Sequence, residues 1–360
     1  YHCLILIYHN SRRIAVSPEI GFAVSQGLPP ARAAGSTLLP LRSPENFFPL
    51  GIYGAPIEAL PGLKAAGFNA VQTYTREAGF LKQFIARAHG LGLKVLIPPP
   101  EWEDPKTLHA FLDDVKASQA ILAWYLADEP EGRGIAPASI WRWRQFLRAH
   151  TPFPGAVALV RAERAQDYAP ATDILMIDTY PIPRMPLTWL SDSLEEARQW
   201  AGGRPVWAVI QAFDWSDVPL KDDPRAWGRY PTYEEGRCLS YLAVVHGAEG
   251  LFYYTFEGEG EKSGSEEYLL HWNNVKKVVA ELRSIYPLLC ASLAEMPRMH
   301  VDRSEVHWAV KEVRAGETED LIEQGRYLIA VNTVDKPLTA AFTIPAVFDD
   351  KVRVLFEERT

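Results

Sequence analysis

Short hydrophobic runs alternate with amphipathic helical patterns along residues 47–256. The first two runs are FFPLGIYG (47–54) and NAVQTYT (69–75), and the segment between them has helical spacing. Six further runs follow, at 94–100, 121–130, 155–160, 174–182, 205–213 and 250–256. Their continuous apolar character indicates parallel strands that are covered on both faces. The pattern therefore predicts a chain of eight β/α units.

Eight such units within about 240 residues predict an α/β fold, a (β/α)₈ TIM barrel. An open doubly wound sheet is the alternative, but that fold usually carries a glycine-rich phosphate turn, which this sequence lacks. We expect the barrel at residues 41–290, closed by one long helix at 268–289. From 291 to 360 the pattern changes to short β-type runs, which predicts a small antiparallel β-sandwich-like domain, shortened at the C-terminus.

Residues 1–40 do not follow this alternation. A short apolar segment, YHCLILIYHN, precedes a tract rich in Ala, Gly, Ser and Pro. An export signal, a pro-segment and an added extension all fit this composition, so no fold element is predicted there. The compartment stays open, with a secreted or periplasmic location slightly favoured over a cytoplasmic one.

Three capping signals indicate where helices begin. Asp104 precedes a proline, an arrangement that suits the first turn of a helix. Ser193 with Glu196, and Thr232 with Glu235, have the spacing of capping boxes. We therefore expect helices to begin at these three points.

Charge and cysteine content disfavour several classes of protein. The net charge is −8, from 37 basic and 45 acidic residues, which disfavours nucleic acid as a partner. Cys3, Cys238 and Cys290 are far apart and lack metal-site spacing, so neither a disulfide framework nor a metal or other cofactor is predicted. No apolar stretch reaches the length of about 18 residues that a membrane span needs.

Candidate chemistry lies at the predicted strand ends, because the carboxyl ends of barrel strands open into the active-site bowl. Asp128 and Glu129 end the run ILAWYLADEP. The other strand ends are rich in carboxylates and aromatics: Tyr53, Tyr74, Glu101, Trp102, Asp178, Tyr180, Gln211, Asp214, Trp215, Tyr254 and Glu257. Acids that protonate a glycosidic oxygen, beside aromatics that stack on sugars, suit glycoside hydrolysis. A carbohydrate is therefore the predicted substrate.

Other interpretations of these residues stay open. None of the nine histidines falls at a strand end, which disfavours a His-based metal site or a Ser-His-Asp triad. A metal-dependent lyase or isomerase would have to hold its metal with carboxylates. Asp128 and Glu129 also fit structural ion pairs with arginine, which would lower their pKa values. Tyr53, Tyr74 and Tyr254 also fit packing beneath the loops.

A strand that ends in ADEP within a (β/α)₈ barrel resembles the clan A glycoside hydrolases, whose fourth strand typically ends in Asn-Glu-Pro. The resemblance implies that Glu129 is the general acid/base and that Asp128 takes the place of the Asn that binds the sugar 2-hydroxyl. It also implies that Tyr180 lies near the nucleophile. In that clan the nucleophile is a Glu at the end of the seventh strand, where this sequence has Gln211 in VIQAFDW.

An amide carries no charge and cannot replace a carboxylate nucleophile. Three explanations follow: another carboxylate takes the role, with Glu257 and Asp178 ahead of Asp214; the substrate assists; or the barrel binds sugar without cleaving it. The sequence favours a hydrolase of a β-linked oligo- or polysaccharide with Glu129 as general acid, and the alternative is a non-catalytic carbohydrate-binding barrel. The predicted substrate-binding residues are Asp128, Tyr53, Tyr74, Trp102, Tyr180, Gln211, Trp215 and Tyr254.

Overall fold

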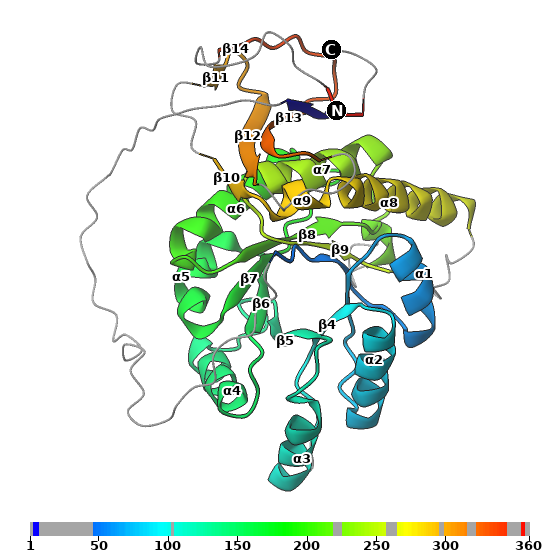
Figure 1. Ribbon diagram of the computed structural model, residues 1–360, viewed down its shortest axis with the longest axis vertical. Coiled ribbons are helices and arrows are strands. Elements are labelled where there is room, and N and C mark those ends of the chain that lie inside the picture. The colour runs from blue at the N-terminus through cyan, green and yellow to red at the C-terminus, as the bar shows by residue number, and fades with distance from the viewer. Residues whose placement is uncertain are drawn as a thin grey trace, which may run out of the picture.

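A computed structural model describes residues 3–6, 46–101, 104–218, 225–256, 265–294, 299–314, 322–343 and 354–356. Eight parallel strands form a closed barrel in chain order (Figure 1). They are β2 (Leu50–Ile52), β3 (Ala70–Gln72), β4 (Lys94–Ile97), β5 (Ile121–Asp128), β6 (Gly155–Leu159), β7 (Ile174–Ile177), β8 (Val206–Gln211) and β9 (Leu251–Tyr254). The pairing of β9 with β2 closes the ring. The predicted barrel is thus confirmed, and the open sheet is excluded.

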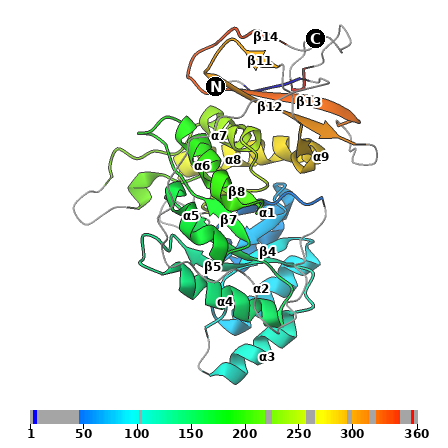
Figure 2. The ribbon, with the colours of Figure 1, turned by 90° about the vertical axis from the view of Figure 1, so that its left-hand side faces the viewer.

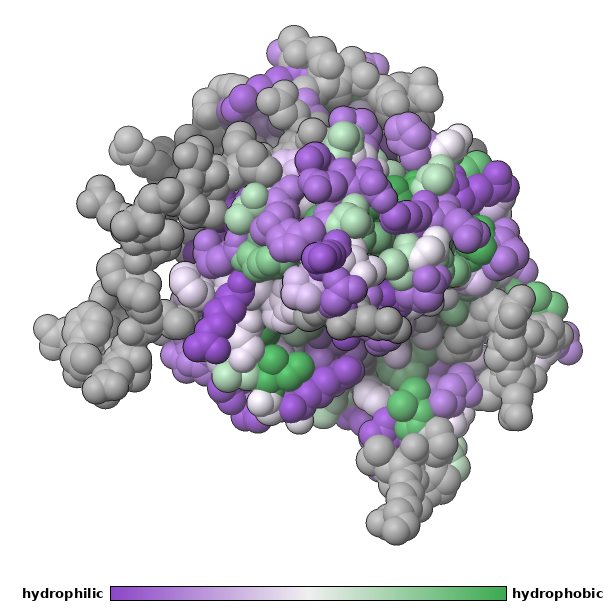
Figure 3. Space-filling model, turned by 90° about the horizontal axis from the view of Figure 1, so that it is seen from below, coloured by the Kyte–Doolittle hydropathy of each residue, from purple (hydrophilic) through white to green (hydrophobic). Residues whose placement is uncertain are grey.

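Helices surround the strands and bury their apolar faces on them. On α2, for example, Leu81, Phe84, Ile85 and Ala88 are buried at helical spacing. The helices are α1 (Leu60–Ala65), α2 (Ala78–Gly90), α3 (Pro105–Val115), α4 (Pro137–His150), α5 (Ala165–Tyr168), α6 (Thr188–Ala201), α7 (Tyr233–Val245), α8 (Glu266–Ser284) and α9 (Tyr286–Cys290). Seen from the side of α3, the outer surface is mostly hydrophilic (Figure 3). No described helix is both long and apolar enough to cross a membrane.

Two of the three predicted helix starts are confirmed. Asp104 caps α3 by accepting hydrogen bonds from the next two free amides, and Thr232 and Glu235 form a capping box at α7. The capping box of Ser193 and Glu196 is wrong, because α6 begins earlier and Ser193 is buried inside it. Buried leucines at 190 and 194 extend the apolar face of α6 on both sides of this serine, and that packing outweighs the local capping signal.

The predicted closing helix is two helices. α8 ends at Ser284 and α9 begins at Tyr286. Pro287 lies in the first turn of α9. A proline inside a helix removes one hydrogen bond and clashes with the carbonyl of the preceding turn, so a single helix through this point is disfavoured.

The C-terminal region forms small antiparallel sheets, as predicted. One sheet has the order β1-β13-β12-β10, and β11 (His300–Val301) pairs with β14 (Phe342–Thr343). The members of the larger sheet are β10 (Ser292–Leu293), β12 (Val306–Val313), β13 (Gly325–Asn332) and β1 (Cys3–Leu6). β1 comes from the N-terminal segment, where no element was predicted, and pairs with β13 of the C-terminal region (Figure 1).

This small β domain packs against the outer side of the helix layer, beyond α7 and α9 (Figure 2). The buried thiol of Cys238 on α7 points to the carbonyl of Asn332 on β13, at 3.6 Å. His246, at the end of α7, forms a hydrogen bond with His307 of β12 between ring nitrogens 2.7 Å apart. The two parts of the chain thus share polar as well as apolar contacts.

A buried ion pair joins α4 to the start of β7. Arg144 donates to one oxygen of Asp173, and the side chains are only 10% and 6% exposed. The other oxygen of Asp173 accepts from the backbone amide of Gly155, at 2.9 Å, at the start of β6. Asp173 therefore links a helix to two neighbouring strands.

We expect Arg144→Met to lower the free energy of unfolding by about 3 kcal/mol, because it leaves the Asp173 charge buried without its partner. Lys82→Met is the matched control. It removes an ion pair whose side chains are 46% and 57% exposed, and such pairs contribute less than about 1 kcal/mol. Urea denaturation measures both variants, and equal losses would contradict the role given to Asp173.

Candidate active site

The end of β5 contains a register shift between Tyr125 and Ala127, which makes Leu126 an extra residue relative to β6. Side chains alternate between the two faces of a strand, so a regular strand with Tyr125 inside would turn Asp128 outward. The bulge reverses this, and the Tyr125 hydroxyl donates a hydrogen bond to Asp128 Oδ1. Gly155 on β6 makes room for the bulge, since a Cβ there would lie 2.5 Å from Leu126 Cδ1.

Both oxygens of Asp128 accept hydrogen bonds. Tyr53 donates to the hydroxyl of Tyr125 at 3.3 Å, and Tyr125 donates onward to Asp128 Oδ1. Arg133 donates to Asp128 Oδ2 at 2.6 Å, from a side chain that is 57% exposed. Asp128 therefore forms an ion pair with an arginine, Arg133, as one interpretation of the sequence expected. It also accepts a hydrogen bond from a tyrosine hydroxyl.

Glu129 has a different environment. Its backbone φ of +44° lies in the left-handed region, which costs a non-glycine residue about 1 kcal/mol and is common at functional sites. The side chain is half-buried, and within the described part of the chain it makes no hydrogen bond. Burial raises the pKa of Glu129, the negative charge of Asp128 raises it further, and Arg133 opposes this. The carboxyl group thus favours its protonated form more than an exposed glutamate does.

Asp178 follows β7 and is 4% exposed. Its Oδ1 is buried with no hydrogen-bond partner among the described residues. Burial raises the pKa of Asp178 well above its usual range, and the charges of Glu129 and Asp128 raise it further. The carboxyl group of Asp178 therefore favours its protonated form more than an exposed aspartate does. Asp178 and Glu129 come from different strands, and the charge of Glu129 acts on Asp178.

Aromatic rings line the same end of the barrel. Tyr53 has ring-centroid distances of 6.0, 5.7 and 5.7 Å to Tyr74, Tyr125 and Tyr254. Tyr74 is 44% exposed, whereas Tyr53 is only 1% exposed. Burial raises the pKa of the Tyr53 and Tyr125 phenols, so both stay neutral and able to donate hydrogen bonds. Tyr74 offers an accessible ring face, and Tyr53 packs beneath it.

A second group of aromatic rings adjoins these tyrosines and completes the aromatic wall of the bowl. Tyr180 stacks on Tyr254 with centroids 5.7 Å apart and meets Trp215 at 6.2 Å. The guanidinium carbon of Arg225 lies 4.6 Å from the centre of the Trp215 ring. The predicted aromatic residues at β2, β3, β7, β8 and β9 thus come together at one end of the barrel.

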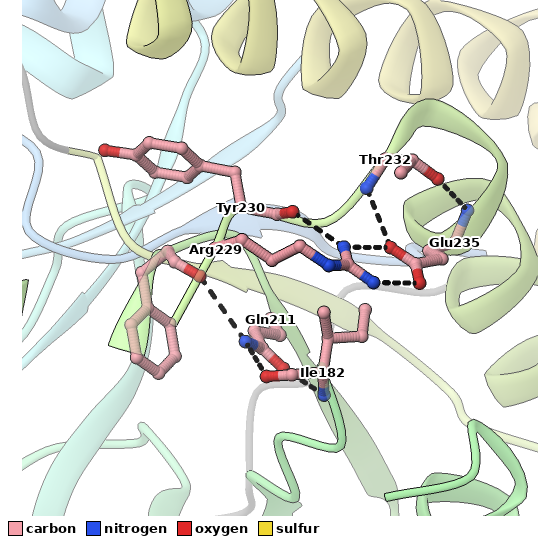
Figure 4. A network of polar contacts seen from close by, with 7 residues as sticks. Ile182, Gln211, Arg229, Tyr230, Thr232 and Glu235 are labelled. Atoms are coloured by element: carbon pink, nitrogen blue, oxygen red, sulfur yellow. Dashed lines mark hydrogen bonds and ion pairs between the residues drawn. The ribbon is translucent and has the colours of Figure 1, made fainter. Parts of the chain in front are cut away.

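The side-chain amide of Gln211 forms hydrogen bonds with backbone groups through both its oxygen and its nitrogen (Figure 4). Its side-chain oxygen accepts from the amide of Ile182 at 2.9 Å, and its Nε2 donates to the carbonyls of Ile182 at 2.9 Å and Phe213 at 3.4 Å. The side chain is 2% exposed. Close by in Figure 4, Arg229 forms a two-contact ion pair with Glu235, with distances of 2.6 Å. Gln211 therefore joins β8 to the loop after β7.

The remaining predicted residues are placed as follows. Trp102 and Glu257 lie outside the described residues. Asp214 is 4% exposed and accepts from the amide of Ser216 at 2.7 Å, which caps a short 3₁₀ turn. Glu101 is exposed. Within the described ranges no three His, Cys, Asp or Glu side chains are grouped in a way that would hold a metal ion.

Tyr125 and Arg133 belong to this site but were not predicted from the sequence. Tyr125 lies in the middle of a buried strand, and only the bulge after it brings Asp128 within reach of its hydroxyl. Arg133 lies in the loop after β5, four positions beyond Glu129. An acidic residue followed by an arginine in a short loop is only a weak indication of an ion pair. The conformation of the loop is what brings Arg133 to Asp128.

Comparisons with known proteins give distant structural similarities. No protein-family model matches the chain, and no curated protein matches its sequence. A glycoside hydrolase family 17 β-1,3-glucanosyltransferase from Rhizomucor miehei is 16% identical, over 58% of this chain and 86% of that one, with a TM-score of 0.41. An endo-β-1,4-mannanase from Thermotoga petrophila is 10% identical, over 86% and 96%, with a TM-score of 0.44.

A GH99 endo-α-mannosidase from Bacteroides thetaiotaomicron is 12% identical, over 64% of this chain and 83% of that one, with a TM-score of 0.47. The fold itself is defined by the strand pairing. The protein is a (β/α)₈ barrel whose open end is lined by carboxyl groups and tyrosines.

We expect Gln211→Glu to destabilise the protein by about 1–3 kcal/mol, because a carboxylate cannot donate to the two carbonyls that the amide now satisfies. Thermal unfolding of Gln211→Glu measures this loss. Gln119→Glu is the control, since this exposed side chain makes one long contact of 3.5 Å and surface substitutions usually stay within about 0.5 kcal/mol. A fully stable Gln211→Glu protein would contradict the structural role of the amide.

Proposed function

We propose that the protein hydrolyses glycosidic bonds in a β-linked oligo- or polysaccharide. The observation that carries this proposal is the pair formed by Glu129 and Asp178. Both carboxyl groups have raised pKa values, and each lies at the end of a barrel strand. Two carboxyl groups that flank the scissile bond are what glycoside hydrolysis uses.

Glu129 is the general acid in this proposal. It is half-buried rather than enclosed, so a glycosidic oxygen can approach it, and its raised pKa favours the protonated form that acid catalysis needs. Its left-handed backbone conformation, held by hydrogen bonds from Gly132 and Arg133 to its carbonyl, fixes the direction of the side chain. Proton transfer goes from the Glu129 carboxyl group to the leaving-group oxygen.

Asp178 is the second carboxyl group. Its Oδ1 is buried and has no hydrogen-bond partner among the described residues, so no donor there neutralises a charge on this group. Loss of its proton would leave a negative charge that stabilises an oxocarbenium-like transition state. Because Asp178 is deeply buried, we assign it charge stabilisation rather than direct attack, and the attacking group is then water or a substituent of the substrate.

The aromatic wall supports sugar as the ligand. Tyr74 and Trp215 are accessible rings of this aromatic group, and the hydroxyl of buried Tyr53 donates to that of Tyr125. Rings of this kind stack on the apolar faces of sugars, and their hydroxyls bind sugar hydroxyls. Asp128, with its donors Tyr125 and Arg133, would accept a further hydrogen bond from a sugar hydroxyl beside Glu129.

A second candidate function is carbohydrate binding without cleavage. Gln211 stands where the resemblance to clan A enzymes calls for a carboxylate, and its amide is committed to the backbone. If no other group supplies the missing charge, the barrel would hold a sugar and leave it intact.

The deciding experiment measures release of reducing ends from β-glucans, galactans, mannans, xylans and uronic-acid polymers. We expect the wild type to cleave one of them and Glu129→Gln to lose activity by about 100-fold or more, since general acid catalysis contributes about that much. Glu196→Gln, on the exposed side of α6, is the control and should retain full activity. Binding to a polymer without any cleavage by the wild type would favour the second candidate function.

The pH dependence of kcat/KM tests the assigned acid. Activity requires protonated Glu129, so kcat/KM falls as pH rises through the raised pKa of this group. Asp128→Asn removes a charge that raises the pKa of Glu129 and of Asp178, so the alkaline fall should begin at a lower pH. Arg133→Gln removes a charge that lowers the pKa of Glu129, so the fall should begin at a higher pH. Shifts in the same direction in both variants would rule out Glu129 as the titrating acid.

A further inference from the structure

A cavity of about 440 Å³ lies at the end of the barrel opposite to the bowl. Its walls are the segments that precede the strands, at 46–49, 205 and 247–249, together with residues 289–293 and Lys311 of β12. The small β domain thus completes a cavity that the barrel begins. Its volume is within the range of about 300–1,000 Å³ that small-molecule pockets have.

Lys311 is the notable group in this cavity. It is 4% exposed, and its Nζ donates to the backbone carbonyl of Leu289 at 2.8 Å. Among the described residues no carboxylate lies within 4 Å of this nitrogen, so the buried ammonium has one neutral acceptor and no ion-pair partner. Burial lowers the pKa of Lys311 to about 8, which still leaves it mostly protonated at pH 7. A buried charge is costly unless an opposite charge accompanies it.

The other titratable groups that line the cavity do not balance this charge. Arg198 adds a second positive charge and donates to the carbonyl of Gly247. Glu249 supplies one negative charge from an exposed position. Burial raises the pKa of the Cys290 thiol, so that group stays neutral. The lining therefore carries a net charge of about +1, which favours an anionic occupant.

Aromatic rings and prolines form a further part of the lining, beside the polar residues Asn46 and Ser292. Phe47, Phe48 and Trp207 line the cavity together with prolines from the segments that precede the strands. The Lys311 nitrogen lies 5.9 Å from the centre of the Phe48 ring, so the positive charge and an aromatic face border the same space. A ligand that fits both features has one negative charge and a flat apolar body.

We propose that this cavity binds a small aromatic monocarboxylate, with its carboxylate on the ammonium of Lys311 and its ring among Phe47, Phe48 and Trp207. The site is independent of the proposed hydrolytic activity, because it lies at the other end of the barrel. Lys311 also lies at the C-terminal end of the short helix α9, so a purely structural role as a helix cap is the interpretation that the experiment must separate from binding.

The experiment is calorimetric titration of the full chain with trans-cinnamate, and with cinnamamide as an uncharged ligand of nearly the same shape. We expect saturable binding of cinnamate, and weakening by about tenfold or more both for cinnamamide and in Lys311→Met, because a charge-assisted hydrogen bond is lost in each case. Glu249→Gln should act in the opposite direction and strengthen cinnamate binding, because it removes the negative charge from the lining. Glu129→Gln should leave the affinity unchanged, which separates this cavity from the bowl.

The proposal is overturned if cinnamate binding to the wild type does not saturate, or if Lys311→Met binds cinnamate equally well. It is also overturned if the neutral cinnamamide binds the wild type as tightly as cinnamate does. Should Lys311→Met unfold, as a purely structural helix cap would predict, Glu249→Gln and the comparison of acid with amide decide the matter. A loss of affinity in Glu129→Gln would move the binding to the bowl and would equally overturn the proposal.

Discussion

Closure of eight parallel strands into one ring is the constraint on which both ends of the molecule depend. The ring closes where β2 meets β9, and there Gly51 leaves space for the ring of Phe252, which a Cβ would approach to 2.3 Å. Because the strands are parallel, closure brings all their carboxyl ends together and all their amino ends together. Glu129 and Asp178 therefore become electrostatic neighbours at one end, while Lys311 borders a cavity at the other.

The barrel could be predicted because buried parallel strands appear in the sequence as uninterrupted apolar runs, and all eight runs became strands. The errors came from features that local patterns do not determine. Ser193 has the sequence of a helix cap, but tertiary packing of α6 extends the helix beyond it. The strand Cys3–Leu6 forms only through pairing with β13, more than three hundred residues away, so its partner was not visible in the segment itself.

The location of the site was predictable, but its internal contacts were not. Asp128, Glu129 and Asp178 follow apolar runs, so their place at the strand ends follows from the fold. The contact between Tyr125 and Asp128 depends on a bulge whose register involves β6, and on the absence of a side chain at Gly155. Likewise, Gln211 differs from the expected glutamate in the sequence, but only the position of the Ile182 backbone explains what an amide does there.

The two adjacent carboxyl groups of ADEP differ because the chain gives them different partners. Asp128 accepts from Tyr125 and Arg133, so a partner occupies each oxygen of its carboxylate. Glu129, one residue later, is turned by its left-handed backbone into a half-buried position beside that charge, and its pKa rises in consequence. Burial is the main cause of the raised pKa values of both Glu129 and Asp178, and the charge of Asp128 raises both further, so one carboxylate acts on two groups from different strands.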